Sequence, residues 1–185
     1  MFQINRSVIP TLAVAFTRAN DPLSAWVALV RGGVKAVENM AFPTHAFVFT
    51  RDQVSLFATE ETMRGLVENS LSRYLSGDRR IVCVYYWDGW QDDERRNAAL
   101  EYLAMVRENG GRSARYDFRA LLSFIPVIGK LFKDDEERQI CSENVAALHK
   151  KFGAKFIRKT LIAPDELLRL MRESSDCRCV LNYYV

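Results

Sequence analysis

Residues 45–60, HAFVFTRDQVSLFATE, hold two apolar runs rich in β-branched and aromatic side chains, separated by Arg51-Asp52. Side chains of this kind favour strands, and a polar dipeptide between two such runs is typical of a β-hairpin. We therefore predict a strand over 45–50, a tight two-residue turn at 51–52 and a returning strand over 54–60. The first strand begins with His45 and the second ends with an acid, Glu60.

The segments on either side of this hairpin favour an α+β fold. Strands are expected over 11–17, 80–87 and 178–185, and 66–75 is ambiguous between strand and helix. Helices are expected from 21 to a stop at Gly32-Gly33, over 92–109, within 120–132, from about 141 to 153 and from 163 onward. Helices and antiparallel strands are segregated along the chain, which indicates an antiparallel sheet or partial barrel packed against helices rather than a parallel sheet.

Length and composition limit the class of protein. The chain has 185 residues, enough for one domain with a core and too short for two comfortable ones, so we expect a single domain over 1–185. Its net charge is +3 and its Lys and Arg residues are scattered, so no nucleic-acid partner is expected. The apolar stretch 11–16 is too short for a signal-peptide core, and no apolar run approaches the ~20 residues that span a bilayer. We expect a cytoplasmic protein without an integral membrane segment, and leave its oligomeric state and its bacterial or viral setting open.

The four cysteines have different contexts. Cys83 lies inside an apolar strand-like run, where a cysteine behaves as a small hydrophobic residue. Cys177 and Cys179 are two residues apart, so a strand would point them the same way, but no second Cys or His pair completes a metal site. We expect no metal and no cofactor. Cys141 is the thiol that needs another explanation.

Cys141 lies where the acidic segment from Asp134 gives way to an amphipathic helix. The free N–H groups at a helix start favour a thiolate, and the Cys141 N–H could donate to an oxyanion. His149 is eight residues further along the same helix, ~12 Å away along its axis, too far to act as the base for Cys141. We expect His149 at the surface, and His45 facing a cleft from the start of its strand.

Several segments in this order resemble the circularly permuted branch of the NlpC/papain-like superfamily, in particular the YiiX/YaeF-like amidases and cysteine peptidases. In that branch the histidine strand precedes the cysteine helix. The matching segments are Thr44-His45-Ala-Phe-Val-Phe, the returning strand that ends in acid, Tyr116-Asp117, Cys141-Ser142-Glu143 and Ala163-Pro164-Asp165-Glu166-Leu167. The resemblance implies a circularly permuted papain-like, or NlpC-like, fold.

The same resemblance implies a thiol hydrolase. Cys141 would be the nucleophile, His45 the base, and Glu60 the acid that orients the imidazole, with Glu61 as the alternative because the register of the hairpin is not fixed. Tyr116 would either support an oxyanion or pack in the core. The bond cleaved would be an amide, peptide or isopeptide bond, and the substrate a peptide, a murein-type molecule or a lipid-linked acyl group.

Two other functions stay open at the level of sequence. One is a lipid-directed thiol acyltransferase or phospholipase, in which the apolar run 121–128 would receive an acyl chain. Relatives of that kind tend to carry a second histidine on the returning strand, where this chain has Phe57 to Glu61 and no histidine. The other is a binding module that keeps the fold without turnover.

Overall fold

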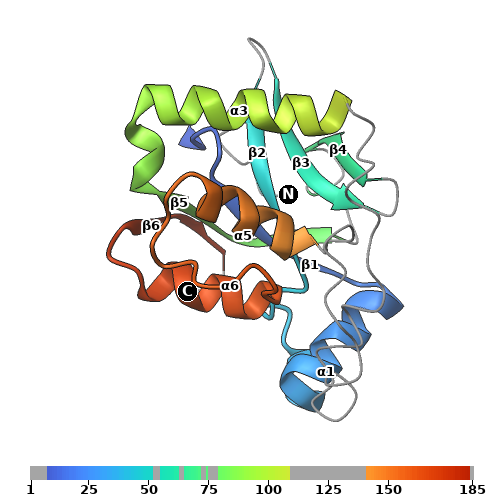
Figure 1. The fold of residues 1–185 in the computed structure, drawn as a ribbon. Coiled ribbons are helices and arrows are strands. Elements are labelled where there is room, and N and C mark those ends of the chain that lie inside the picture. Colours follow the sequence, from blue (N-terminus) through green and yellow to red (C-terminus); the bar gives the residue numbers. More distant parts are fainter. Residues whose placement is uncertain are drawn as a thin grey trace.

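The computed structural model describes residues 8–51, 55–62, 65–71, 74, 79–108 and 141–183. Within these residues six strands form one open antiparallel sheet of order β4-β3-β2-β1-β5-β6 (Figure 1). The strands are β1 (Val14–Ala19), β2 (His45–Arg51), β3 (Leu56–Thr62), β4 (Gly65–Ser70), β5 (Arg79–Trp87) and β6 (Cys177–Asn182). The helices are α1 (Pro22–Glu38), α3 (Asp93–Glu108), α5 (Cys141–Lys151) and α6 (Pro164–Glu173), with a short 3-10 helix η2 (Asp88–Gln91). The predicted α+β class and antiparallel sheet are confirmed.

The β2–β3 hairpin is present, but its predicted two-residue turn is wrong. Arg51 continues the strand and pairs with Leu56, so four residues connect the strands, of which 52–54 lie outside the described part. The guanidinium of Arg51 donates to the carbonyl of Ile9 at 3.3 Å, which gives this polar residue a partner at the end of the ladder. The returning strand therefore begins later than predicted and runs past Glu60 to Thr62.

The ambiguous segment 66–75 begins as a strand. β4 pairs with β3 over the whole of its length, from Gly65 opposite Thr62 to Ser70 opposite Phe57. Tyr74 follows β4, buried, with its ring 4.6 Å from that of Phe47 in β2. Tertiary packing thus decides a segment whose own pattern suits both conformations.

Helix α1 begins as the sequence predicts but ends later. The Asp21 side chain caps it by accepting a hydrogen bond from the Ser24 N–H at 2.8 Å. Gly33 has a φ of 72°, a conformation that glycine adopts without the steric penalty of a side chain, and breaks the helix there. The helix then resumes and runs to Glu38. The predicted stop at Gly32-Gly33 is therefore a kink.

Helices α5 and α6 lie together against the sheet. α5 contacts β2 and β3, and α6 contacts α5, β5 and β6 (Figure 1). Their contact with the sheet buries most of the apolar side chains of both helices. This packing sets the first residue of α5 against the strands of the predicted hairpin.

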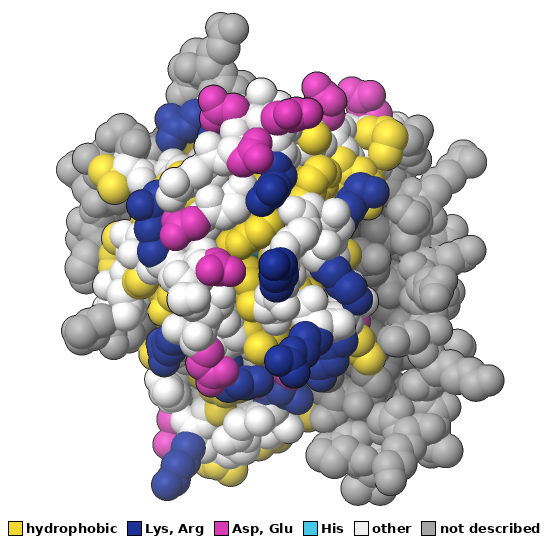
Figure 2. All heavy atoms as spheres, turned by 60° about the vertical axis from the view of Figure 1, so that its left-hand side comes forward, with side chains coloured by type: hydrophobic (Ala, Val, Ile, Leu, Met, Phe, Trp, Pro, Cys, Tyr) yellow, Lys and Arg dark blue, Asp and Glu magenta, His cyan; other side chains and the backbone are white. Residues whose placement is uncertain are grey.

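The surface carries both signs of charge. On the face in Figure 2, Lys and Arg side chains are interspersed with Asp and Glu and with apolar side chains. No helix in the described residues has both the length and the apolar character that crossing a bilayer requires.

Candidate active site

His45 and Glu60 share one face of the sheet. β2 and β3 pair Val48 with Thr59, so Glu60 stands one step further along, opposite Phe47. Alternate residues of a strand face the same side, so His45, Phe47 and Glu60 lie on one face, with His45 and Glu60 as diagonal neighbours. The His45 Nε2 and Glu60 Oε2 atoms are 2.6 Å apart. The Glu60 side chain is 1% exposed and that of His45 is 18% exposed, so only the histidine faces outward.

Cys141 is brought to the same face by α5. It is the first residue of the helix, it is buried, and its side chain is close enough to His45 to raise the pKa of that imidazole. The Nε2 of His45 is engaged by Glu60, which leaves Nδ1 as the ring nitrogen for the thiol. A sulfur, an imidazole and a carboxylate from three separate elements thus lie in series.

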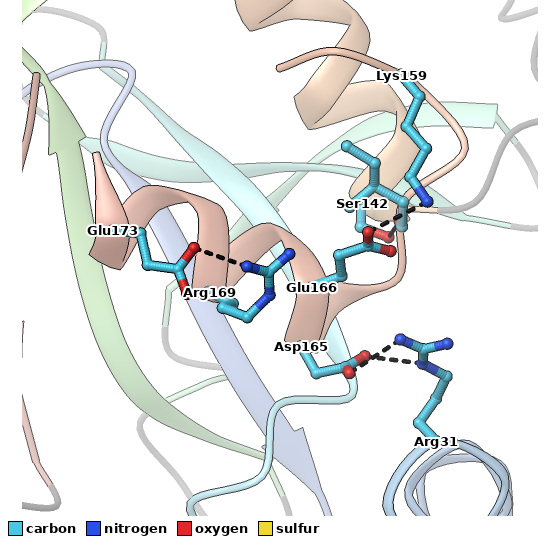
Figure 3. A network of polar contacts seen from close by, with 8 residues as sticks. Arg31, Ser142, Lys159, Asp165, Glu166, Arg169 and Glu173 are labelled. Atoms are coloured by element: carbon cyan, nitrogen blue, oxygen red, sulfur yellow. Dashed lines mark hydrogen bonds and ion pairs between the residues drawn. The ribbon is translucent and has the colours of Figure 1, made fainter. Parts of the chain in front are cut away.

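The start of α5 is fixed by the residues beside α6. The Ser142 hydroxyl donates to the carbonyl of Ile162 at 2.5 Å, and both residues are fully buried. Next to this contact, Lys159 pairs with Glu166 at 3.1 Å (Figure 3). The residue that follows Cys141 is therefore anchored to the backbone before α6, which limits movement of the thiol.

An ion pair also ties α6 to α1. Arg31 meets Asp165 through two contacts of 3.1 Å each, in a bidentate geometry (Figure 3). Such paired N–H···O contacts add geometric specificity as well as energy. Asp165 and Glu166, which carry part of the sequence resemblance, are thus engaged in ion pairs with Arg31 and Lys159.

The charges of the three groups are coupled. Burial by itself lowers the pKa of His45, but the facing Cys141 and Glu60 outweigh burial and raise it to about 10. Burial likewise raises the pKa of Glu60, but hydrogen bonds and the charge of His45 outweigh it and lower the pKa to about 2. At neutral pH the site therefore holds an imidazolium beside an ionised carboxylate.

Two further residues, which the sequence analysis missed, interact with Glu60. The Asn69 side-chain amide donates to Glu60 Oε1 at 2.5 Å, and the buried Tyr74 side chain also lowers the pKa of the Glu60 carboxyl. Asn69 pairs with Ala58, two residues before Glu60, so it lies on the same face. The strand assignment of 65–70 is the signal that would have found it.

The remaining predicted site residues are placed as follows. The contact to His45 is made by Glu60, whereas Glu61 occupies the next position of β3, with its backbone opposite Leu66. Tyr116 lies outside the described residues, as does the run 121–128. Among the described residues, no three His, Cys, Asp or Glu side chains are grouped as a metal site would require.

The prediction that His149 lies at the surface is wrong. Its side chain is buried, and its ring nitrogens contact Trp90 and the carbonyl of Val145. The short helix η2 folds Trp90 over α5, and Trp87, Trp90 and Phe156 form an aromatic enclosure around the ring, with Phe152 packed against Trp90. Burial lowers the pKa of His149 to about 4, so this imidazole is neutral at pH 7. A Leu-His-Lys-Lys pattern gives no sign of the enclosure, because the tryptophans come from a distant segment.

The other thiols differ from Cys141 in their surroundings. Cys83 is buried in β5 and burial raises its pKa to about 12, and burial does the same to Cys177. Cys179 is exposed on β6. In the described residues, Cys141 is the thiol whose side chain raises the pKa of a neighbouring imidazole, that of His45.

Comparison with known proteins reveals the fold. The sequence has no match among the models of protein families or among curated proteins. The structure is similar to the crystal structure of metalloprotein YiiX from Escherichia coli O157:H7, a DUF1105 protein. The two share 13% sequence identity with a TM-score of 0.60, over 95% of this chain and 98% of that one. The fold is YiiX-like. At this identity the likeness extends to the architecture, and the metal belongs to the description of YiiX.

Proposed function

We propose that this chain is a cysteine hydrolase that cleaves an amide, peptide or isopeptide bond through an acyl-thioenzyme. The observation that supports it best is the position of His45, whose ring contacts Glu60 on one side and Cys141 on the other. A nucleophile, a base and an orienting group in hydrogen-bonded series is the arrangement that activates a thiol for acyl transfer. The YiiX-like fold agrees with the sequence resemblance to permuted NlpC/papain-like enzymes.

Acylation would begin from a Cys141 thiolate beside the imidazolium of His45. The Cys141 thiolate adds to the carbonyl carbon of the substrate, and the carbonyl oxygen gains negative charge. The first N–H groups of a helix have no intrahelical acceptor, so the start of α5 can donate to that oxygen. The C–N bond then breaks as the His45 imidazolium gives its proton to the leaving amine, which leaves a thioester on Cys141.

Deacylation would reverse the roles of the same groups. The neutral imidazole of His45 takes a proton from water as the water oxygen adds to the thioester carbon. The C–S bond breaks, the acid product leaves, and the thiolate–imidazolium pair is restored. Throughout, Glu60 keeps its hydrogen bond to Nε2, which holds Nδ1 toward the sulfur and stabilises the positive ring.

Thiol reactivity tests the proposal without a known substrate. In a Cys179→Ser background, which removes the exposed thiol, iodoacetamide at pH 7 should modify Cys141 at least tenfold faster than Cys83 and Cys177. Intact-mass spectrometry and peptide mapping give the rate at each site. Cys141→Ala in the same background is the control and should lose the fast phase. Equal rates at Cys141, Cys83 and Cys177 would contradict a tuned nucleophile.

Turnover distinguishes the proposed chemistry from its alternatives. A panel of peptidyl aminocoumarins, muropeptides and short-chain phospholipids should yield amide cleavage that Cys141→Ala abolishes. Cleavage or acyl transfer confined to the phospholipids would contradict the amide hydrolase and favour the lipid-directed enzyme. A fast-reacting Cys141 without turnover on any of them would leave the proposed amide chemistry unsupported and favour the binding module.

A further inference from the structure

The carboxylate behind His45 is held from two further sides. Glu60 Oε2 faces His45, while Oε1 accepts from the Asn69 amide at 2.5 Å. The buried side chain of Tyr74 also lowers the pKa of this carboxyl group. With the Glu60 side chain 1% exposed, protein donors replace the water that would solvate an exposed carboxylate. Nothing in acyl transfer requires Asn69 or Tyr74 to touch a substrate.

All three partners of Glu60 can donate to it. The Asn69 amide and the Tyr74 hydroxyl carry protons, and the imidazolium of His45 carries one on Nε2. A protonated Glu60 would place an O–H donor opposite groups that are themselves donors, and fewer hydrogen bonds to the carboxyl would form. The enclosure therefore favours the ionised form even though burial opposes it. An ionised Glu60 keeps the proton of His45 on Nε2 and leaves Nδ1 for the thiol.

We propose that Asn69 and Tyr74 are positioning residues, which act on His45 through Glu60 and so set the ring tautomer that the reaction uses. The inference rests on the proposed hydrolase function for its effect on turnover, although its effect on His45 does not need turnover. Sheet register supports it, because Asn69 in β4 and Glu60 in β3 project from one face. Packing supports it as well. The Tyr74 ring lies against the ring of Phe47, and Phe47 is on the same face of β2 as His45 and next to its ring.

The test uses Tyr74→Phe, Asn69→Ala and the double variant. Tyr74→Phe removes the hydroxyl and retains the ring that packs on Phe47, so it keeps the test open should Asn69→Ala disturb β4. With ¹⁵N-labelled histidine, NMR should show the pKa of His45 about one pH unit lower in each single variant, and lower again in the double variant. Where a substrate is available, kcat should fall about tenfold and KM should stay within about twofold, because each change removes a polar group that stabilises the charge of Glu60.

The Glu60→Gln background tells positioning from a general structural effect. If Asn69 and Tyr74 act through Glu60, their substitutions should leave the His45 pKa nearly unchanged once Glu60 is Gln. They should then also change kcat by less than twofold. Glu68→Gln is the matched control, since Glu68 neighbours Asn69 in β4 but bonds to Thr50 and Arg107, and it should leave His45 unchanged. Effects of the Asn69 and Tyr74 substitutions that persist undiminished in Glu60→Gln overturn the proposal. It is also overturned if Glu60→Gln changes the His45 pKa while neither Asn69→Ala nor Tyr74→Phe does. The proposed hydrolase fails separately, if wild type shows the pKa coupling but no turnover.

Discussion

The two histidines of this chain lie in regions that treat the same side chain in opposite ways. His45 stands at the start of β2 between a carboxylate and a thiol, and its pKa is raised to about 10. His149 lies near the end of α5 within an aromatic enclosure, and burial lowers its pKa to about 4. One imidazole is cationic at neutral pH and the other is neutral.

The difference shows that burial alone does not decide what a histidine does. Burial opposes the charged form of both rings, and at His149 the carbonyl of Val145 offsets only part of that effect. At His45 the neighbours are Glu60 and Cys141, which bear negative charge when ionised, and their attraction exceeds the cost of desolvation. A histidine with anionic partners can move a proton near neutral pH, whereas His149 serves as a neutral hydrogen-bonding residue of the core.

Titration of the two rings tests most directly whether their charges differ at neutral pH. We expect ¹⁵N NMR of labelled histidine to show His45 protonated at pH 7 and His149 neutral, with midpoints about six pH units apart, from about 10 against about 4. His149 should appear as the tautomer with its proton on Nδ1, since that atom donates to the Val145 carbonyl and Nε2 accepts from Trp90. Cys141→Ala should lower the midpoint of His45 and leave that of His149 in place. Two overlapping titrations near 6.5 would contradict the contrast.

Substitution of the reacting groups should separate the two regions by activity. We expect Cys141→Ala and His45→Ala to lower kcat/KM by more than about 10³-fold, because each removes a group that forms or breaks bonds. His149→Phe retains an aromatic ring in the enclosure and should keep activity within about threefold. Circular dichroism provides the control that the fold persists. Comparable losses for His149→Phe would show that the aromatic region takes part in the reaction.

Glu60→Gln removes only the charge of the acid beside His45. Gln retains the shape and one acceptor but no longer stabilises a positive ring, so kcat should fall roughly ten- to a thousandfold. The matched control is Glu68→Gln in the neighbouring strand, whose side chain bonds to Thr50 and Arg107, and it should stay within about twofold of wild type. An unchanged rate in Glu60→Gln would mean that Cys141 and His45 work as a dyad.

The smallest expected effect is on stability, and it depends on pH with opposite signs at the two rings. The pKa of His149 is lower in the folded protein than its ordinary 6.5, so its stabilisation is present above about pH 6.5 and is lost as pH falls toward 4. The pKa of His45 is raised, so its stabilisation is present below about pH 6.5 and is lost as pH rises toward 10. Between pH 7 and 5, wild type should therefore lose about 2 kcal/mol more unfolding free energy than His149→Phe. Urea unfolding at the two pH values measures this difference, and equal losses in the two proteins would contradict a buried neutral His149.

Much of the local structure was readable from the sequence because its signals are local. Apolar runs between polar dipeptides gave most of the strands, Asp21-Pro22 gave the start of α1, and the change from acidic to amphipathic sequence gave a helix start at Cys141. The prediction of Cys141 and His45 as the reactive pair rested on their residue types and sequence contexts, together with a family resemblance. That Cys141, His45 and Glu60 act in catalysis stays a prediction.

The tertiary structure decided what depends on segments distant in sequence. The β2–β3 register places Glu60 against His45, and a turn of four residues rather than two shifts that register without any change in the strand pattern. Pairing of β4 with β3 makes a strand of an ambiguous segment and brings Asn69 to the carboxylate. His149 is buried because η2 folds Trp90 over α5. A sequence pattern records which face of an element is apolar, but the partners that set the charge of a buried group come from elsewhere in the chain, and only packing chooses them.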